Sequence, residues 1–305
     1  MVLAGGVGAA RFLRGLVAAV PGTEITVIGN TGDDLEVHGL HVSPDLDTVT
    51  YTLAGLADLE RGWGLAGESW AVLGGLGRLG ADTWFQLGDR DLATHLWRTE
   101  QLRRGRPLSA ATAALAERLG LPVRLLPMTD QPVTTRVHTV DGRDLHIQEF
   151  FVRERCRPAI AHVEYQGIEA AGPGPGVLAA LAAAAVVVLA PSNPIMSLGP
   201  ILALPGVRAA VAAARRTVAI SPIIAGKALK GPATAMMAAA GVAPTVVGIA
   251  QLYRDCVQAL VLDEADAALS GAVASQGVRP VVTDTLMVDL AAATRLARVA
   301  LEAAA

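Results

Sequence analysis

Aromatic side chains are scarce in this 305-residue chain: four tryptophans, three tyrosines and four phenylalanines make up 4% of it, although 52% of the residues are hydrophobic. The apolar residues are therefore mainly Ala, Val and Leu. Charged residues are also few, at 17%, and the formal net charge is −3. This composition excludes an intrinsically disordered chain, which needs low hydrophobicity and high net charge. It also provides no global basic field that would attract nucleic acid.

Cysteine and long hydrophobic runs are scarce as well. Cys156 and Cys256 lie far apart, without metal-ligand spacing, so we expect two reduced thiols and no disulfide framework. The most hydrophobic run, 177–190, is shorter than the roughly 18 residues that a membrane span needs. No charged segment precedes the first apolar residues, as it would in a signal peptide. We therefore expect a cytoplasmic protein that binds neither nucleic acid nor membranes.

Short β-branched runs alternate along the chain with longer segments rich in Ala and Leu. This alternation predicts a Rossmann-like α/β fold, with a mostly parallel sheet and helices on both faces, in a single domain over residues 1–305. The predicted strands are Val2–Ala4, Ile25–Gly29, Val123–Leu126, Val186–Ala190, Val218–Ile220, Val246–Ile249, Leu260–Leu262 and Pro280–Val282. The predicted helices are Ala9–Val20, Asp47–Leu59, Asp91–Arg103, Ser109–Leu119, Pro200–Arg215, Pro232–Ala240, Ala265–Gln276 and Met287–Ala304.

Two segments depart from this alternation. Asp141 and Gly142 lie between two alternating runs, and Asp-Gly favours a hairpin because both central turn residues can take positive φ. Residues 132–165 are therefore predicted to form an appended β-hairpin. Six of the eleven aromatic residues fall between Tyr51 and Trp97, and we expect residues 51–105 to form a helical cap over one end of the sheet.

Glycines join the first predicted strand to the first predicted helix. Gly5, Gly6 and Gly8 permit a tight turn in which backbone N–H groups, including that of Val7, approach a phosphate closely. The fingerprint is imperfect, because Arg11 occupies the position of its third glycine and no P-loop lysine follows. A plain strand-to-helix turn is the alternative. The order strand, glycines, helix favours a nucleotide or phosphate site.

Acidic residues follow the glycines in two groups. Asp33 and Asp34 come after the second strand, and Asp45 and Asp47 lie at a helix start. Asp47 could simply cap that helix, but capping explains Asp45 and the Asp33–Asp34 pair poorly. Carboxylates beside a phosphate-binding loop can hold Mg²⁺ or accept a proton from an attacking hydroxyl. The second group therefore indicates a metal or acid–base site.

Seven short motifs are spread over nearly the whole chain, and Thr283–Met287 follows them. Each is modest alone, but seven in one order are specific. Together they resemble the 2-phospho-L-lactate transferases of coenzyme F420 biosynthesis, and Arg61–Gly64 with Trp84–Phe85 resembles the bacterial branch of that family. The motifs are Ala4–Gly8, Asn30–Asp34, Ser43–Thr48, Leu87–His95, Leu126–Asp130, Ala190–Pro194 and Ser221–Ile224.

The resemblance implies a Mg²⁺-dependent reaction. An enzyme of this family takes an acid activated with guanosine diphosphate and moves its phosphoester part onto the ribityl hydroxyl of the deazaflavin Fo, and GMP leaves. The resemblance also implies a Rossmann-like core and a homodimer. Family members use phospholactyl, phosphoenolpyruvyl or phosphoglyceryl donors, and the sequence does not select among the three.

The resemblance also implies roles for particular residues. Asp45 and Asp47 are the expected catalytic residues: one binds Mg²⁺ and the other contacts or activates the Fo hydroxyl, in either assignment. Asp33 is the second expected metal ligand. For Asp47→Asn we expect nearly intact folding and a turnover lowered by roughly 10²-fold, as for a lost acid–base or metal group. Unchanged turnover would make Asp47 a simple helix cap.

Further expected contacts lie on both substrates. Trp84 suits an aromatic wall for the flat deazaflavin, although packing within the cap is the alternative, and an ion pair is the alternative for Arg90. Ser192 and Asn193 could be ordinary turn residues, but they follow a strand at its carboxyl end, where open α/β sheets bind ligands. Lys230 and Lys227 are the only lysines. The expected Fo contacts are Asp47, Trp84, Gln86, Asp89 and Arg90. The expected nucleotide contacts are Gly6, Val7, Gly8, Asn30, Ser192, Asn193 and Lys230.

Two other functions remain open. A nicotinamide-dependent oxidoreductase would share the glycine turn, but it would need an acid about 20 residues beyond the glycines, and Asp33 and Asp34 come slightly late. A non-catalytic sugar-nucleotide-binding regulator of related fold would need neither the Asp45–Asp47 pair nor the aromatic cluster. Binding of Fo and GDP, against NAD(H) or a UDP-sugar, separates the three functions.

Overall fold

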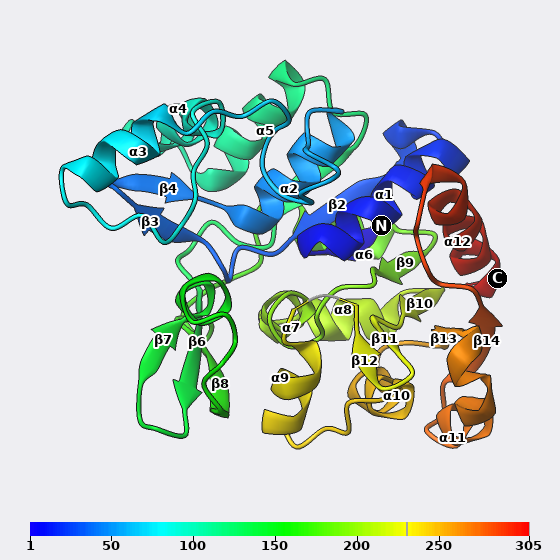
Figure 1. Cartoon of the computed structure of the whole chain (residues 1–305). Coiled ribbons are helices and arrows are strands. Elements are labelled where there is room, and N and C mark those ends of the chain that lie inside the picture. Colours follow the sequence, from blue (N-terminus) through cyan, green and yellow to red (C-terminus); the bar gives the residue numbers. More distant parts are fainter. Residues whose placement is uncertain (230, 305) are drawn as a thin grey trace.

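Seven parallel strands form the central sheet of the protein in a computed structural model, which describes residues 1–229 and 231–304 (Figure 1). All neighbouring strands in this sheet are parallel. The predicted Rossmann-like α/β fold is therefore confirmed. In spatial order the strands are β14 (Arg279–Thr283), β13 (Ala259–Asp263), β10 (Thr217–Ile220), β9 (Val187–Leu189), β1 (Val2–Ala4), β2 (Thr26–Gly29) and β5 (Arg124–Pro127).

Helices cover both faces of this sheet, because successive residues of each buried strand point to opposite sides. Val2 and Ala4 belong to the hydrophobic cluster of one face and Leu3 to that of the other. The first face is covered by α1 (Gly6–Ala19), α2 (Pro44–Leu53), α5 (Leu108–Arg118) and α12 (Leu290–Ala303). The second is covered by α6 (Val177–Ala183), α7 (Leu198–Ala203), α8 (Val207–Ala213), α9 (Ala233–Ala239), α10 (Val246–Tyr253) and α11 (Ser270–Ala274).

Several predicted boundaries were wrong. The β-branched run Val246–Ile249 is the first turn of helix α10, because the Thr245 side chain accepts a hydrogen bond from the Gly248 N–H and caps a helix there. The predicted helix Pro200–Arg215 is divided into α7 and α8 at Gly206, whose φ is +80°. The predicted helix Asp47–Leu59 ends at Leu53. Four short elements complete this core: η1 (Gly22–Glu24), β11 (Ile223–Ile224), β12 (Lys227–Ala228) and η3 (Glu264–Leu269).

The predicted hairpin is part of a three-stranded antiparallel sheet. Its strands are β6 (Thr134–Thr139), β7 (Asp144–His146) and β8 (Ile160–Gln166), with β6 in the middle. The second arm ends at His146, because the chain then enters a π-helix, η2 (Glu149–Arg153). The third strand, β8, was not predicted. Val137 of β6, Ile147 after β7 and Phe150 of η2 join this part of the chain to the main core.

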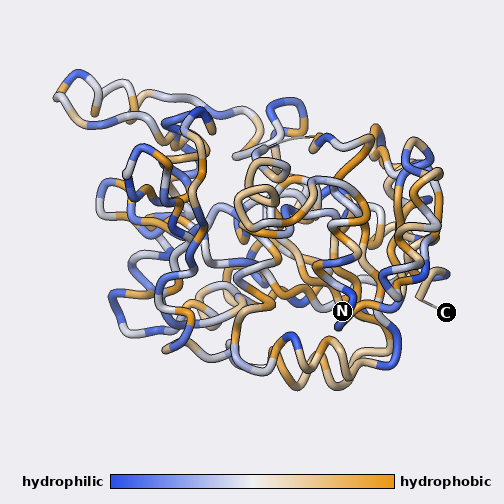
Figure 2. Tube along the Cα trace, turned by 90° about the horizontal axis from the view of Figure 1, so that it is seen from below, coloured by the Kyte–Doolittle hydropathy of each residue, from blue (hydrophilic) through white to orange (hydrophobic). Residues whose placement is uncertain are grey.

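Residues 51–105 include helices α3 (Ala71–Arg78) and α4 (Asp91–Arg103), and much of the rest of this segment is turn and loop. An unpredicted hairpin, β3 (Leu35–Val37) and β4 (Leu40–Val42), lies beside α4 (Figure 1). This side of the molecule is bluer than the side that holds the C-terminal strands and helices (Figure 2). Among the described helices, none is both long and apolar enough to span a membrane.

Candidate acidic site at the switch point of the sheet

The glycine turn lies where the strand order reverses. From central strand β1 the chain continues to β2 on one side, whereas β9 pairs with β1 on the other side. Open α/β sheets bind ligands at such a point, outside the carboxyl ends of the strands. Gly6 begins helix α1 with φ +74°, which favours glycine. A Cβ on Gly8 would clash with the carbonyl oxygen of Pro191, so α1 starts in close contact with the segment that follows β9.

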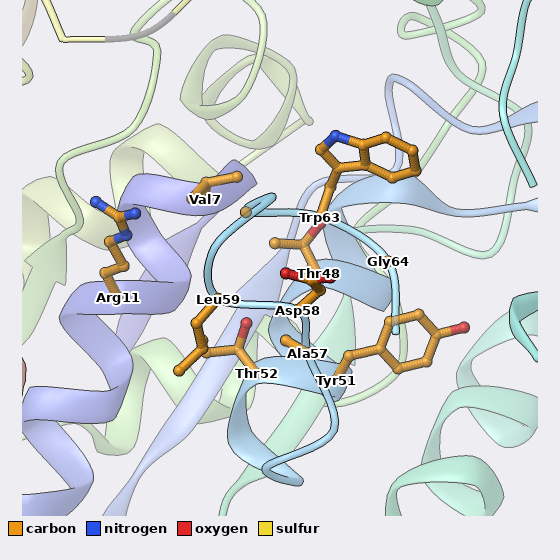
Figure 3. A pocket seen from close by; sticks show the side chains of 11 residues that line it. Val7, Arg11, Thr48, Tyr51, Thr52, Ala57, Asp58, Leu59, Trp63 and Gly64 are labelled. Atoms are coloured by element: carbon orange, nitrogen blue, oxygen red, sulfur yellow. The ribbon is translucent and has the colours of Figure 1, made fainter. Parts of the chain in front are cut away.

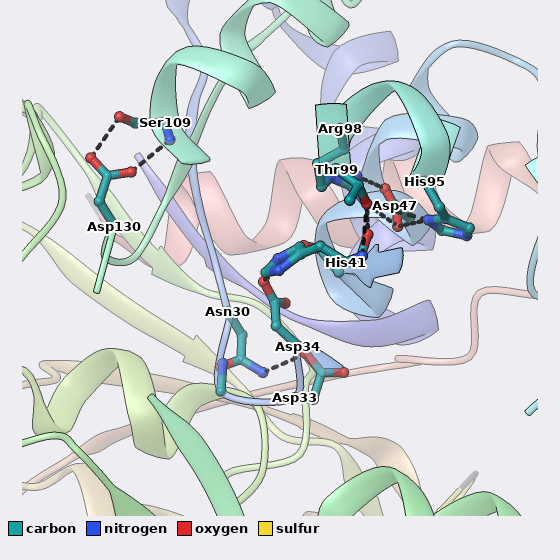
Figure 4. Close-up of polar contacts among 12 residues, drawn as sticks. Asn30, Asp33, Asp34, His41, Asp47, His95, Arg98, Thr99, Ser109 and Asp130 are labelled. Carbon is teal, nitrogen blue, oxygen red and sulfur yellow. Dashed lines mark hydrogen bonds and ion pairs between the residues drawn. The ribbon is translucent and has the colours of Figure 1, made fainter. Parts of the chain in front are cut away.

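Asn30, at the end of β2, joins two of the predicted acids. Its Nδ2 donates to Asp45 Oδ2 at 2.9 Å and to Asp33 Oδ1 at 3.4 Å, and all three side chains are buried (Figure 4 shows Asn30 and Asp33). Its Oδ1 accepts the Gly32 N–H at 2.8 Å, which fixes the orientation of the amide. A Cβ on Gly5 would clash with Asp45 Oδ2, so the carboxylate lies directly against the glycine turn. The structure thus brings Asp33, Asp45 and Asn30 together beside Gly6.

Within residues 1–229 and 231–304, no cationic side chain pairs with the two joined carboxyls. Burial raises the pKa of Asp45 to about 6, and hydrogen bonds from Asn30, the Gly6 backbone and Ser197 oppose the rise. Burial also raises the pKa of Asp33 well above its ordinary value, and the nearby Asp45 and Asp34 charges raise it further. A buried carboxylate without a counter-ion is costly. The cluster is therefore suited to receive a cation or a proton.

Asp34 adds a third acid to this side of the site. Its Oδ2 accepts from Ser43 Oγ at 2.8 Å and lies 3.0 Å from His41 Nε2 (Figure 4). Its Oδ1 is buried and has no hydrogen-bond partner among the described residues. Burial raises the pKa of this carboxyl, although His41 and Ser43 oppose the rise. The free oxygen is a second indication that this cluster could accept a cation or a donor group.

Gln148 contacts the cluster from the segment between β7 and η2, and no motif in the sequence pointed to it. Its Nε2 donates to Asp33 Oδ2 at 2.9 Å, and both side chains are buried. It directly precedes the π-helix η2, and π-helical turns are frequent at functional sites. Only the folded chain could reveal this contact, because the two residues are 115 positions apart.

Asp47 lies on another side of helix α2, away from the glycine turn. Both of its oxygens contact Arg98 of α4, and one of these contacts, with Nη1, is 3.0 Å (Figure 4). His95 Nδ1 lies 3.8 Å from Asp47 Oδ2, and His95 Nε2 lies 3.1 Å from Asp91 Oδ1 without hydrogen-bond alignment. Burial alone would lower the pKa of Arg98, but Asp47 raises it above its ordinary value. Asp47 is thus half of a buried ion pair.

The residues expected to contact Fo take other partners in this structure. Asp89 accepts hydrogen bonds from Ser69 Oγ and from the N–H groups of Ala71 and Val72, at the start of α3. The Arg90 guanidinium donates to the Ala66 carbonyl at 2.5 Å, which is not the ion pair considered as its alternative. Gln86 is exposed. Trp84 packs edge-to-face on Phe85, and the Arg153 guanidinium lies 5.9 Å from its ring centroid.

The expected nucleotide contacts after β9 shape the turn itself. Ser192 Oγ donates to the Gly5 carbonyl at 2.8 Å and ties the glycine turn to the end of β9. Asn193 Oδ1 accepts the N–H groups of Ile195 and Met196 at 2.9 and 3.1 Å. Both side chains therefore have the local partners of turn residues. Lys230 lies outside the described residues.

A divalent cation fits the acids at this site. Mg²⁺ keeps several waters and is usually bound by one or two carboxylates together with substrate phosphates, so it needs no complete cage of protein ligands. Asp33 and Asp45 supply two carboxylates beside the glycine turn, and Asp34 has a free oxygen. Among the described residues no group of three or more His, Cys, Asp or Glu side chains has a geometry that could hold a metal by itself. The donors present therefore suit a cation shared with a phosphate.

The sheet, the glycine turn and the acids together define a Rossmann-like α/β protein with an acidic site at its switch point. Residues 1–300 match the family described as 2-phospho-L-lactate transferase CofD, and the chain belongs to this family. It is similar to a phosphoenolpyruvate transferase of Kitasatospora aureofaciens, with 46% identity covering 99% of this chain and 96% of that protein. A 2-phospho-L-lactate transferase of Methanosarcina mazei is 36% identical, and the match covers 99% of each chain.

The fold has a counterpart among solved structures. A Bacillus halodurans protein of the UPF0052 family superposes with a TM-score of 0.63, covering 98% of this chain and 97% of that chain. The sequence identity is 17%, so this likeness concerns the fold alone.

Proposed function

We propose that this CofD-family transferase moves the phosphoenolpyruvyl group from a guanosine diphospho-activated donor to the ribityl hydroxyl of Fo, in coenzyme F420 biosynthesis. The hydroxyl oxygen forms a bond to the phosphorus that carries the enolpyruvyl group. The bond from that phosphorus to the bridging oxygen breaks, GMP leaves, and the hydroxyl proton passes to solvent. The observation that carries this proposal is the acid cluster of Asp33 and Asp45 against the glycine turn.

The choice of donor follows the relatives. Five actinobacterial relatives named phosphoenolpyruvate transferase are 45–47% identical to this chain, and the relative named 2-phospho-L-lactate transferase is 36% identical. Phospholactyl and phosphoglyceryl donors differ only at the carbon skeleton of the acid. The three donors are therefore compared directly in the test below.

Transfer of this kind depends on positioning and on charge neutralisation more than on covalent chemistry. The turn at Gly6, Val7 and Gly8 would hold the diphosphate of the donor. Asp33 and Asp45 would hold Mg²⁺, which when bound neutralises charge that develops on the phosphate oxygens. Asp47, whose two oxygens contact Arg98, positions α2 in this proposal and does not take the proton.

The test is a discontinuous assay with purified protein, fluorescent Fo, MgCl₂ and each of three guanylylated acids: phosphoenolpyruvyl, phospholactyl and phosphoglyceryl. We expect GMP and the Fo phosphodiester to appear in equal amounts, fastest with the phosphoenolpyruvyl donor. The matched control omits Mg²⁺ and contains EDTA. If neither Fo nor GDP binds while NAD(H) or a UDP-sugar does, the protein is an oxidoreductase or a regulator instead. We also expect a homodimer, which light scattering would measure.

A further inference from the structure

A small groove lies between helices α1 and α2 and the loop 57–64, and we propose that it binds the carboxylate of the transferred acid. This inference rests on the proposed function, because it assigns one part of the donor to one part of the site. Its residues come from α1, from α2 and from the loop 57–64 (Figure 3). They are Val7, Arg11, Thr48, Tyr51, Thr52, Ala57, Asp58, Leu59, Gly62, Trp63 and Gly64.

Two lining residues place one end of the groove near the glycine turn. Val7 directly follows Gly6, and Thr48 is one helical turn after Asp45, on the same side of α2. Since Asp45 lies against the glycine turn, one end of the groove adjoins the expected diphosphate position. In the donor the carboxylate is only two bonds away from the oxygen that carries the phosphorus. A carboxylate subsite must therefore lie close to the phosphate subsite, and the position of Val7 one residue after Gly6 is consistent with this.

The size of the groove limits its occupant. The space inside is about 20 Å³, which is enough for one or two water-sized groups. Such a small space suits a group of the size of a carboxylate. Leu59 and Trp63 of the loop 57–64 line the groove, and Arg61 holds this loop by donating to Asp58 Oδ2 at 2.9 Å and to the Leu65 carbonyl at 2.8 Å.

The charges in the groove favour an anion. The Arg11 side chain extends back along α1 toward the level of Val7 (Figure 3), and no hydrogen bond or ion pair engages its guanidinium within the described parts of the chain. A guanidinium fork matches the two oxygens of a carboxylate. Asp58 is the one acid of the lining, and Arg61 together with two backbone N–H groups already satisfies its carboxylate. The hydroxyls of Thr48 and Thr52 add neutral donors.

The position of Arg11 also resolves a departure from the dinucleotide-binding pattern. That pattern places a glycine at this position so that helix and strand pack closely. Here the residue lines the groove instead of packing under the helix. A plain nucleotide site does not need a long cationic side chain one turn into α1. An acid attached to the terminal phosphate would be bound by such a side chain.

The experiment compares donor, GDP and phosphoenolpyruvate on four proteins: the parent protein, Arg11→Ala, Thr48→Val and Arg14→Ala. Arg14 lies on the same helix but does not line the groove, so its variant is the matched control. We expect Arg11→Ala to raise KM for the phosphoenolpyruvyl donor roughly 10- to 100-fold, as for a lost hydrogen bond to a charged group. We expect Thr48→Val to raise it less. GDP, which has no carboxylate, should bind all four proteins equally by calorimetry.

Other outcomes would refute the carboxylate subsite, the proposed function or both. If Arg11→Ala weakens GDP as much as the donor, Arg11 binds the diphosphate and the carboxylate subsite is refuted. Unchanged KM for the donor in Arg11→Ala refutes it too. If Fo is no acceptor but phosphoenolpyruvate binds the parent protein and not Arg11→Ala, the proposed function fails and the subsite stands. If neither GDP nor phosphoenolpyruvate binds the parent protein, both proposals fail.

Discussion

Helix α2 carries two buried aspartates whose surroundings differ completely. Asp45 shares the Asn30 amide with Asp33, and burial, together with the charges of neighbouring acids, raises the pKa values of both acids. Asp47 is bound through both oxygens to Arg98, which is itself buried. Residues two apart on a helix point roughly 200° away from each other. The two acids therefore cannot serve one site together, although their spacing in sequence suggested that they do.

The difference separates a functional charge from a structural one. A buried carboxylate that already has its cation contributes to the native arrangement, and a further ligand would have to displace that cation. A buried carboxylate without one destabilises the unliganded fold, which evolution tolerates where a ligand supplies the missing charge. On this argument the Asp45 side of α2 is the site and the Asp47 side anchors the helix to α4.

Breaking the Asp47–Arg98 pair has the largest expected effect. Asp47→Asn leaves Arg98 buried without its counter-ion, and we expect the free energy of unfolding to fall by about 3–5 kcal/mol. This replaces the expectation of nearly intact folding that the sequence suggested. Urea denaturation measures the change. The control is Arg104→Ala, which removes an exposed pair with Glu100 on the same helix and should cost at most about 1 kcal/mol. Full stability with lost turnover would return Asp47 to catalysis.

Neutralising Asp45 should have opposite effects on activity and stability. Asp45→Asn removes an expected Mg²⁺ ligand, and we expect kcat to fall by roughly 10²-fold or more. The same change should stabilise the unliganded protein at pH 7 by about 1–3 kcal/mol, because it removes an uncompensated buried charge. Thermal unfolding without Mg²⁺ measures the second effect. A loss of both activity and stability would place Asp45 with Asp47 among the structural residues.

The pH dependence of stability sharpens this contrast. The pKa of Asp45 is raised to about 6 in the folded protein, against about 4 in an unfolded chain. Protonation of Asp45 therefore contributes to the free energy of unfolding. This contribution is fully present below pH 4 and disappears as the pH rises through 6. We expect the stability of the parent protein, relative to Asp45→Asn, to decline between pH 4 and pH 6. A difference that stays constant over this range would contradict the raised pKa.

Removing the Gln148 contact should have a smaller effect, and this effect should be confined to Mg²⁺ binding by the Asp33–Asp45 cluster. Gln148→Ala leaves Asp33 Oδ2 without its donor, and loss of a group that orients a metal ligand typically costs 10–100-fold in metal affinity or activity. We expect the Mg²⁺ concentration for half-maximal rate to rise roughly 10-fold, with kcat nearly restored at saturating Mg²⁺. Gln166→Ala, an exposed glutamine of the appended sheet, is the control. If kcat falls and Mg²⁺ cannot restore it, Gln148 acts on something other than the metal.

The sequence predicted the strands of the central sheet better than it predicted the hydrogen-bond and ion-pair partners of the residues in the loops. Buried parallel strands appear as short β-branched runs between helical segments, so β1, β2, β5, β9, β10, β13 and β14 could all be located. Local patterns also located the glycine turn and its acids, because both follow strand ends directly. The run at Val246 misled, since β-branched residues also occur at a capped helix start.

Side-chain partners could not be predicted where they lie far apart in sequence. Arg98 is 51 residues from Asp47, and nothing local indicates that it neutralises that acid rather than another. Gln148 reaches Asp33 only because the appended sheet packs onto the core. The motif Leu87–His95 indicated a functional segment. Whether Asp89 faces a ligand or a helix end depends on how the loop at Ser69 folds back.

Substitution of Asp89 has the smallest expected effect, and it tests whether this residue is structural, like Asp47, or functional, like Asp45. Its carboxylate accepts three hydrogen bonds at the start of α3, and these lower its pKa, the largest contribution coming from Ser69. Asp89→Ala should therefore lower Tm slightly and leave kcat and the KM for Fo unchanged. The lowered pKa implies that the stability difference persists at neutral pH and fades as the pH falls below the ordinary aspartate range. An increased KM for Fo at unchanged Tm would instead show that Asp89 turns toward the deazaflavin when it binds.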